Sequence, residues 1–294
     1  MRAPDLQGRR FGCAVAVIIS ACGLGFLNPL PVFAADLTSA SGDVRTGACG
    51  ASLREIWTLA PDTRQPPAAA LAQLGVERLW GEQNLRVNAG GVIKVSYPAG
   101  SINPGNAHAP TGGAGFLYAG PPGQRRARTH ACLAYEVKFP RDFDFVRGGK
   151  MPGMYGGEAP SGGEAVAEHP GFSLRYMWRG NGLGEVYAYL PSKYELEYGE
   201  SIGRGKIRFV RGKWHRLEQE IVLNQPGAAD GILRVWEDGN KVIERRDILY
   251  WTQVRLGVAG LMFSTFFGGH EAIWASPRDQ AIEIRNIRFL SDES

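Results

Sequence analysis

Residues 172–190 read Phe172-Ser173-Leu174-Arg175-Tyr176-Met177-Trp178, then Arg179-Gly180-Asn181-Gly182-Leu183-Gly184-Glu185, then Val186-Tyr187-Ala188-Tyr189-Leu190. In the first and third parts, residues of two kinds alternate with a period of two, which is typical of strands with one buried face. Glycine and asparagine fill the middle part, and these are turn residues. The stretch therefore predicts an antiparallel β-hairpin.

The register of this hairpin follows from its apolar face. A turn centred on Asn181 makes paired positions face each other as Leu174 with Ala188 and Tyr176 with Val186. A slip of one residue would put the two apolar sets on opposite faces of the sheet. Burial of one face therefore favours the register centred on Asn181.

The same register builds a polar patch on the other face. It pairs Arg175 with Tyr187 and Ser173 with Tyr189, and directly opposed side chains lie about 5 Å apart. The patch holds a guanidinium, a hydroxyl and two phenols. It is either a binding surface or the ordinary polar outer face of an antiparallel sheet.

Period-two runs recur from about residue 79 to the end. They are bounded by Gly, Pro and Asn, and they cover residues 91–97, 131–139, 206–210, 214–223, 232–237, 241–244, 256–267 and 282–289. Asp238-Gly239 between two of these runs is a tight-hairpin signal. Many strands and almost no helical periodicity predict an all-β chain, a jelly-roll β-sandwich of two antiparallel sheets.

The chain begins with a stretch that we expect to be removed. Three arginines within residues 1–10 precede an apolar run over 11–27 and the sequence Val32-Phe33-Ala34-Ala35, a pattern typical of a secretory signal peptide. The apolar run is short for a membrane span, which needs about 20 residues. We therefore expect a secreted or periplasmic protein with no membrane span; lipoprotein anchoring at Cys22 is the less favoured alternative.

The remaining chain divides into two parts in this interpretation. Residues 36–78 form a partly irregular N-terminal extension, in which 53–59 and 68–74 look locally ordered and the second resembles a short helix. Residues 79–294 form the jelly-roll domain. We expect the protein to be a monomer.

The net charge of the chain narrows the classes of binding partner. The 294 residues carry a formal net charge of +4, but the leader holds three Arg and one Asp, so half of that net charge belongs to it. A near-neutral, exported chain is a poor nucleic-acid binder.

Cys49 and Cys132 are the cysteines left after cleavage. They form either a disulfide or two separate buried thiols, and the sequence leaves both alternatives open.

A second feature is the sequence Gly148-Gly149-Lys150-Met151-Pro152-Gly153-Met154-Tyr155-Gly156-Gly157. Five glycines and a proline in ten residues predict a tight loop rather than a regular strand, and this loop would present Lys150. The alternative is a plain turn with a solvated lysine. The spacing does not match a phosphate-binding loop, so nucleotide binding is excluded.

A third feature is a basic cluster. Six Lys and Arg occur within residues 204–216 without an acidic residue, and period two places Arg204, Lys206 and Arg208 on one strand face. Such a stripe attracts polyanions, although charged side chains also protect strand edges against aggregation.

The five histidines show no metal-ligand spacing, and the sequence contains no nucleophile elbow. We therefore expect neither a metal nor a cofactor.

Taken together, these motifs resemble polysaccharide lyase family 14, the alginate and glucuronan lyases of jelly-roll fold. The resemblance rests on the glycine-rich segment 148–157, the Phe-Ser-Leu-Arg segment 172–175 and the Val-Tyr-Ala-Tyr segment 186–189. Residues 212–215, 263–269 and 284–287 add to it. It covers roughly residues 130–290.

The resemblance implies a uronate polysaccharide as substrate and β-elimination as the reaction. It places the working groups on Lys150, Ser173, Arg175, Tyr187 and Tyr189. In this hypothesis Lys150 and Tyr187 form the proton-transfer pair, Arg175 binds the carboxylate, and Ser173 and Tyr189 position the others. Which of Lys150 and Tyr187 is the base stays open.

Substrate recognition needs further groups. We expect substrate contacts from Arg204, Lys206, Trp178 and His169. The alternatives to an alginate or glucuronan lyase are a non-catalytic carbohydrate-binding jelly roll and a lyase for another acidic glycan.

Overall fold

The computed structural model describes residues 48–49, 52–163, 170–191, 198–251 and 256–292. The predicted signal peptide, residues 1–35, and the alternative anchor at Cys22 lie outside these ranges. Within them, no helix is long and apolar enough to cross a membrane.

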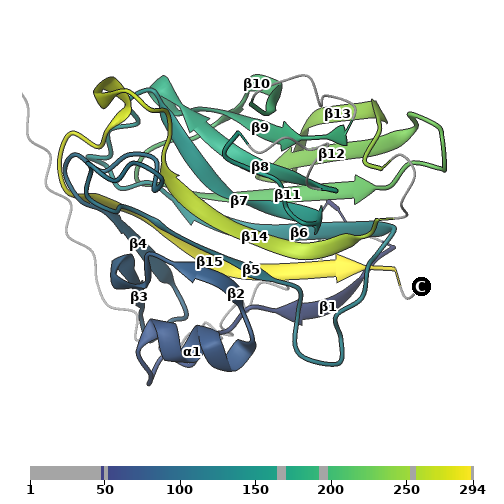
Figure 1. Cartoon of the computed structure of the whole chain (residues 1–294), viewed down its shortest axis with the longest axis horizontal. Coiled ribbons are helices and arrows are strands. Elements are labelled where there is room, and N and C mark those ends of the chain that lie inside the picture. The colour runs from purple at the N-terminus through teal and green to yellow at the C-terminus, as the bar shows by residue number, and fades with distance from the viewer. Residues whose placement is uncertain (1–47, 50–51, 164–169, 192–197, 252–255, 293–294) are drawn as a thin grey trace, which may run out of the picture. The chain divides into compact units, whose positions relative to one another are not determined.

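Two antiparallel sheets form a sandwich, as the sequence predicts (Figure 1). The strands of the eight-stranded sheet are β1 (Arg54–Thr58), β3 (Leu85–Val87), β4 (Ile93–Tyr97), β6 (His130–Lys138), β11 (Trp214–Val222), β12 (Gly231–Glu237), β13 (Asn240–Ile248) and β15 (Gln280–Ser291). They lie in the order β13-β12-β11-β6-β15-β4-β3, and β1 also pairs with β15.

The seven-stranded sheet carries the residues singled out by the motifs. Its strands are β2 (Glu77–Trp80), β5 (Ala114–Tyr118), β7 (Gly148–Gly157), β8 (Gly171–Arg179), β9 (Leu183–Tyr189), β10 (Glu200–Arg208) and β14 (Val258–Phe267). They lie in the order β10-β9-β8-β7-β14-β5-β2. Helical turns are short: α1 (Pro67–Leu74), η1 (Glu82–Asn84), η2 (Gly180–Gly182) and η4 (Ala272–Trp274).

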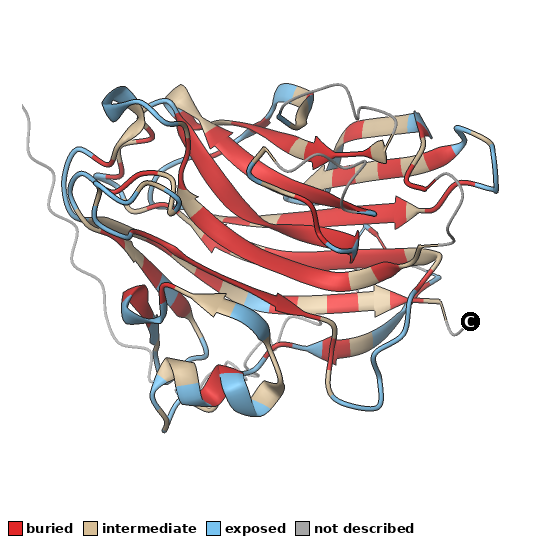
Figure 2. Cartoon of the chain, viewed as in Figure 1, coloured by how far each residue is buried: buried red, intermediate tan, exposed pale blue. Residues whose placement is uncertain are grey.

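The core fills the space between the sheets, and the buried residues form nearly continuous bands along β7, β8 and β14 (Figure 2). An aromatic cluster lies at its centre. The indole of Trp178 contacts the rings of Tyr97, Phe139, Phe143 and Phe267 at centroid distances of 5.3–5.9 Å. Large rings bury the most apolar surface per residue, so this cluster is a main source of stability.

The hairpin of β8 and β9 has the register that the apolar face predicts. Leu174 faces Ala188 and Tyr176 faces Val186, all fully buried, while Arg175 faces Tyr187 and Ser173 faces Tyr189. Asn181 adopts a φ of 59° at the turn, a conformation that asparagine tolerates better than most residues.

The glycine-rich segment 148–157 is where the sequence prediction was wrong. It forms β7, a ten-residue strand in the middle of the sheet, rather than a loop. Its glycines let neighbours approach closely: a Cβ on Gly149 would lie 2.1 Å from the indole of Trp178, and one on Gly153 would lie 1.9 Å from the carbonyl of Leu174. Glycine thus serves close packing here instead of a turn.

Pro152 is accommodated in β7 by a bulge. Met151 pairs with Tyr176 and Gly153 with Arg175, so Pro152 is an extra residue without a partner on β8. A proline has no N–H to donate, and bulges are among the few places where a sheet tolerates it. The extra residue changes the phase of the strand, so Lys150 before it and Gly153 after it lie on the same face.

Two buried polar side chains of the opposite sheet bind this bulge. Tyr135 on β6 donates its hydroxyl hydrogen to the carbonyl of Pro152 at 3.0 Å. Gln219 on β11 accepts a bond from the Met154 N–H at 2.9 Å. Backbone groups that the bulge removes from the ladder are thereby satisfied from across the core.

The N-terminal extension contributes to both sheets. β1 pairs with β15, and β2 pairs with β5, while residues 67–74 form the short helix α1. β1 lies within residues 36–78, which the sequence interpretation separates from the jelly roll, and β2 crosses that boundary.

Cys49 and Cys132 form a disulfide, which resolves the two alternatives left by the sequence. It ties the start of the described chain to β6, and the Cys49 N–H donates to the Glu218 carboxylate at 2.8 Å. A cross-link over 83 residues restricts the unfolded chain and so favours the folded state.

His215 supplies a pH-dependent contribution to stability. Its buried ring lies 3.3 Å from the Glu237 carboxylate and 3.2 Å from that of Asp238. Burial alone would lower the pKa of His215, but these two acids outweigh it and raise the pKa above 6.5. The stabilisation is complete below the unfolded pKa and is lost as the pH rises through the folded pKa.

We therefore expect His215→Gln to lower the free energy of unfolding more at about pH 6 than at about pH 9. Denaturant unfolding at both pH values measures the difference. His108→Gln is the control because His108 is exposed in a loop. An equal loss at both pH values would contradict the ionic role of His215.

Candidate active site

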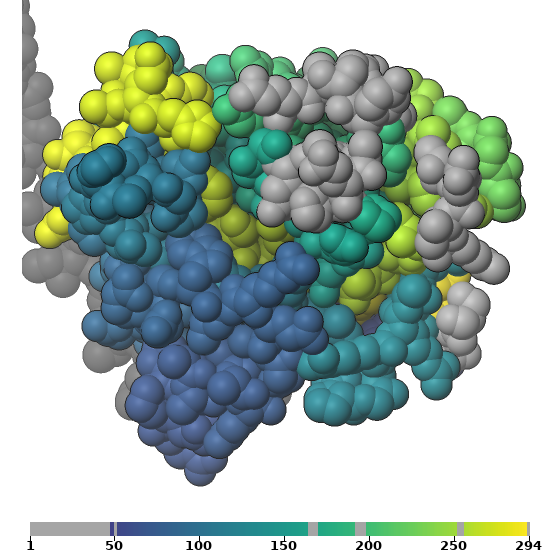
Figure 3. All heavy atoms as spheres, in the orientation of Figure 1, coloured from purple at the N-terminus to yellow at the C-terminus, as the bar shows by residue number. Residues whose placement is uncertain are grey.

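A cavity of about 270 Å³ opens on the face of the seven-stranded sheet that points away from the core. Four of the five predicted site residues line it: Lys150 from β7, Arg175 from β8, and Tyr187 and Tyr189 from β9. Figure 3 shows a hollow in which yellow-green atoms of the β14 region lie between blue atoms of the N-terminal segment and the yellow loops near residue 270.

Lys150 is the central cation of the cavity, and only 8 % of its surface is exposed. Its Nζ lies 3.4 Å from the centroid of the Tyr187 ring and 2.9 Å from Sδ of Met177. A π-face and a thioether are weak partners for an ammonium group. Among the described residues, no carboxylate pairs with Lys150.

The surroundings of Lys150 favour its neutral form. Burial is the largest effect and lowers the pKa of Lys150 well below 10.5. The nearby charges of Arg175, Arg179 and Arg204 lower this pKa further, and Glu185 opposes them. A neutral amine can accept a proton, whereas an ammonium group cannot.

The pKa of Tyr187 shifts in the opposite direction. Burial, together with the neighbouring Tyr189, raises the pKa of Tyr187 to about 12, although Arg179 and Arg175 act in the other direction. The phenol therefore carries its proton at neutral pH. Burial therefore outweighs the two neighbouring cations in setting the pKa of this tyrosine.

Arg175 points its guanidinium into the cavity beneath Tyr189. Its Nη1 donates to Ser264 Oγ on β14 at 3.4 Å, and its Cζ lies 5.9 Å from the Tyr189 ring centroid. The side chain is 2 % exposed. A guanidinium can bind a carboxylate in bidentate fashion.

Ser173 does not line the cavity. Its buried hydroxyl donates to the carbonyl of Pro160 at 2.6 Å. The hydroxyl of Tyr189 accepts a bond from the Gly163 N–H at 3.2 Å. Both side chains thus hold the segment 160–163 over the sheet.

A buried glutamate organises the charges beside Lys150, and the sequence interpretation missed it. Glu185 on β9 is 0 % exposed and accepts hydrogen bonds from Arg179, Arg204 and Ser201. Burial would raise the pKa of Glu185, but the hydrogen bonds and charges of both arginines hold it below its ordinary value. Glu185 therefore stays ionised and fixes Arg179 at the cavity wall.

The four predicted substrate-binding residues have different outcomes. Trp178 is fully buried in the aromatic cluster and cannot stack on a sugar, so this assignment is corrected. Arg204 binds Glu185 at the edge of the site. Lys206 is exposed and does not line the cavity. His169 lies outside the described residues.

The basic cluster 204–216 is not one continuous stripe. Its first part lies on β10 and its last part on β11, which belong to different sheets. Two positive-φ glycines, Gly203 and Gly205, also break the period-two pattern on β10. Most of these cations have local partners, such as Asp238 for Lys213 and Glu218 for Arg216.

The cavity is also lined by residues that were not among the predicted site residues. They are Asn103, Met177, Arg179, Tyr198, Phe266, His270 and Trp274. Met177 and Arg179 alternate with Arg175 on β8, so the hairpin pattern could have found them. Phe266 lies on β14 and Trp274 in η4, and the other three come from loops. No local pattern predicts where such segments meet the sheet.

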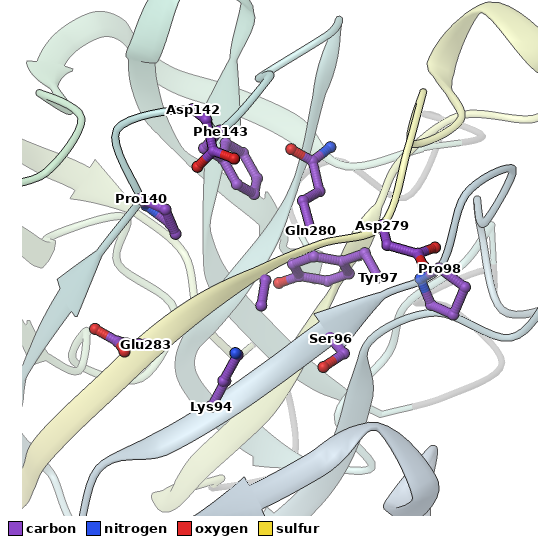
Figure 4. A pocket seen from close by; sticks show the side chains of 11 residues that line it. Lys94, Ser96, Tyr97, Pro98, Pro140, Asp142, Phe143, Asp279, Gln280 and Glu283 are labelled. Atoms are coloured by element: carbon purple, nitrogen blue, oxygen red, sulfur yellow. The ribbon is translucent and has the colours of Figure 1, made fainter.

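A larger cavity, of about 450 Å³, lies near β4 and β15 (Figure 4). It contains none of the predicted site residues, and three acidic residues line it, Asp142, Asp279 and Glu283. Two of these acids have structural partners: Asp279 accepts from the Ala99 N–H, and Glu283 pairs with Lys138. Its acids would repel a polyanion.

Among its described lining residues, the cavity around Lys150 shows no metal-ligand geometry. In the described part of the chain, one group of His, Cys, Asp or Glu residues has suitable spacing, namely Cys49, Cys132 and Glu218. The two cysteines of that group are joined in the disulfide. No described residue set therefore offers a metal site.

Comparison with known proteins identifies the class. The model of the family described as Polysaccharide lyase 14 matches residues 86–287, which is well over half of the chain. The protein belongs to this family, as the motifs predict, and it is a polysaccharide lyase. A search of curated proteins finds no match.

Solved structures share the fold. The marine PL-14 alginate lyase from Aplysia kurodai is 29 % identical; the match covers 81 % of this chain and 100 % of that chain, with a TM-score of 0.69. The alginate lyase vAL-1 from Chlorella virus is 24 % identical, with coverage of 81 % and 100 % and a TM-score of 0.67. The second match supports the fold alone.

The bulge contacts generate a prediction. Gln219→Leu leaves the buried Met154 N–H without its acceptor, which costs about 1–3 kcal/mol, and it frees the strand that carries Lys150. We expect lower stability together with lower lyase activity, measured by denaturant unfolding and by steady-state kinetics.

Tyr176→Phe is the matched control for Gln219→Leu. The Tyr176 hydroxyl is also buried in the core, but it has no hydrogen-bond partner among the described residues. Its removal should leave stability and activity nearly unchanged. Equal effects of the two substitutions would argue against a specific role for Gln219.

Proposed function

We propose that the protein cleaves alginate by β-elimination in the cavity around Lys150, and that it acts outside the cytoplasm. The observation that carries the proposal is the burial of Lys150 against Tyr187 and Met177, beside Arg175 and without a described carboxylate partner. A lysine in this setting can act as a base toward an anionic substrate bound in the cavity.

The lining of the cavity favours an acidic polysaccharide. Lys150, Arg175 and Arg179 line it, and no Asp or Glu is among its described lining residues. Tyr187, Tyr189 and Trp274 provide rings suited to the faces of sugars. The Aplysia protein, which is an alginate lyase, supports alginate as the particular polyuronate.

In the proposed mechanism, Arg175 binds the uronate carboxylate and stabilises the charge that develops on its oxygens. The neutral amine of Lys150 takes the proton from the carbon that bears the carboxylate. The electron pair of that C–H bond forms a double bond to the next carbon as the glycosidic C–O bond breaks.

Tyr187 completes the reaction as the acid. Its hydroxyl donates a proton to the departing glycosidic oxygen, which leaves a phenolate beside the newly formed ammonium of Lys150. Return of one proton from Lys150 to Tyr187 restores both groups. No redox group is needed, because the bonds and protons balance.

The leader sequence supports action outside the cytoplasm. The basic start, short apolar run and Ala34-Ala35 ending favour export, and a disulfide such as Cys49–Cys132 persists in oxidising compartments.

We expect Lys150→Ala and Tyr187→Phe each to lower kcat on alginate by about 10²-fold or more, because each removes one proton-transfer group. The ultraviolet absorbance of the unsaturated product measures the reaction with polymannuronate, polyguluronate and glucuronan as substrates. Lys213→Ala, an exposed change outside the cavity, is the control. Full activity of both variants would defeat the assignment, and binding without turnover by the unaltered protein would indicate a lectin.

The charges around Lys150 predict the direction of two pH shifts. Lys150 is active when deprotonated, so the acidic limb of the kcat/KM profile follows its pKa. Arg179→Gln removes a cation and should raise this pKa, moving the limb to higher pH. Glu185→Gln removes an anion and should move it to lower pH.

Lys213→Gln has the same loss of charge as Arg179→Gln and should leave the limb in place. A shift of the two site variants in the same direction would contradict Lys150 as the group that titrates.

A further inference from the structure

A second cavity, of about 240 Å³, continues the groove beyond the proposed catalytic cavity. Four residues line both cavities: Asn103, Gly162, Arg175 and Phe266. The far end of the second cavity is formed by Arg78 and Trp80 on β2. The two cavities therefore form one groove that crosses the strands of the seven-stranded sheet.

The groove is long compared with a single sugar. From β8, which carries Arg175, to β2, which carries Trp80, there are four steps between neighbouring strands. At about 4.8 Å a step, the groove extends roughly 19 Å beyond Arg175. A polysaccharide that lies across the strands would reach β2.

Arg78 places a positive charge at this end. Its Nη1 donates to the carbonyl of Glu158 at 3.1 Å, a neutral acceptor that leaves the charge of the guanidinium uncompensated by that bond. The neighbouring Glu77 pairs with Arg125 at 2.7 Å. No Asp or Glu is among the described residues that line the second cavity.

The backbone at Arg78 is held in an unfavourable conformation. Its φ is 53°, which residues other than glycine rarely adopt. The pairing of β2 with β5 also shifts between Glu77 and Trp80. Such strain persists where the surroundings fix it, and it concentrates at functional sites.

Trp80 supplies an aromatic surface beside this charge. Its half-buried indole lies over Gly115 on β5, where an added Cβ would come within 2.2 Å of the ring, and it meets the Phe266 ring edge-on at 6.1 Å. Glycine at position 115 therefore lets the indole lie close against the sheet. Residues 77–80 precede the family match, which begins at residue 86.

We propose that Arg78 and Trp80 form a distal subsite for a further uronate unit of the same polysaccharide, with the ring stacked on Trp80 and the carboxylate bound by Arg78. This inference rests on the proposed function, since it assumes that a polyuronate occupies the groove. The subsite would strengthen binding of long chains and leave the chemistry at Lys150 unchanged.

The test is the dependence of kcat/KM on chain length, measured with alginate oligosaccharides of increasing length and with the polymer. For the unaltered protein, kcat/KM should rise until the chain fills the distal subsite. Arg78→Ala and Trp80→Ala should remove that rise through KM, lowering kcat/KM on the polymer about tenfold, and match the unaltered protein on the shortest substrate cleaved. Trp80→Phe should restore part of the rise.

Two further readouts separate binding from structure. Arg78→Ala should weaken the salt dependence of KM because a charge contact with the substrate is lost. Arg64→Ala, an exposed change in the same segment outside both cavities, should alter neither property. Melting temperatures show whether each variant is folded. Because Arg78 is exposed, Arg78→Ala still tests the subsite if Trp80→Ala is unstable.

Unchanged kcat/KM on the polymer, or equal losses at every chain length, would overturn the distal subsite while leaving the proposed function intact. Absence of alginate cleavage by the unaltered protein would overturn the proposed function, and the subsite with it.

Discussion

The bulge at Pro152 is the constraint on which the site depends. One extra residue in β7 places Lys150 on the outer face of the sheet while Met151 and Met154 stay in the core. The bulge exposes backbone groups inside the sandwich, and Tyr135 and Gln219 satisfy them from the opposite sheet. The sandwich therefore does more than support the site, because its far layer fixes the strand that carries the central lysine.

Charge distribution then separates the groove from the rest of the surface. On the eight-stranded sheet, cations and acids pair across strands, as Lys138 does with Glu283 and Arg285 with Glu136. The groove on the seven-stranded sheet has cations without acids among its described lining residues. The acid that does lie close, Glu185, is buried behind Arg179 and Arg204 and serves to orient them. This charge distribution favours a polyanion in the groove over the larger cavity near β15.

Much of this arrangement could be predicted from the sequence, for a physical reason that differs between elements. The β8–β9 hairpin was predictable because one face must be buried, and this requirement admits a single register. The Asp238-Gly239 turn was predictable because both residues tolerate the positive φ they adopt.

Other parts could not be read from local patterns. Glycine in β7 serves close packing against Trp178 and Leu174, and composition alone does not distinguish this role from a turn. Trp178 was assigned to substrate because indoles suit sugars, although its alternation with Leu174 and Tyr176 places it on the buried face of the hairpin. The pKa values of Lys150 and Tyr187 depend on burial, which no short motif encodes. Arg78 and Trp80 reach the groove through the pairing of β2 with β5, a contact between segments far apart in the chain.

The central claim is that Lys150 is a neutral base at the pH where the enzyme works. Its titration can be followed directly by nuclear magnetic resonance of lysine side chains labelled with ¹³C at Cε, with Lys150→Ala identifying the signal. The account predicts that Lys150 titrates well below the ordinary value of 10.5. A pKa at or above 10.5 would contradict it, because Lys150 would then be an ammonium group unable to accept the proton.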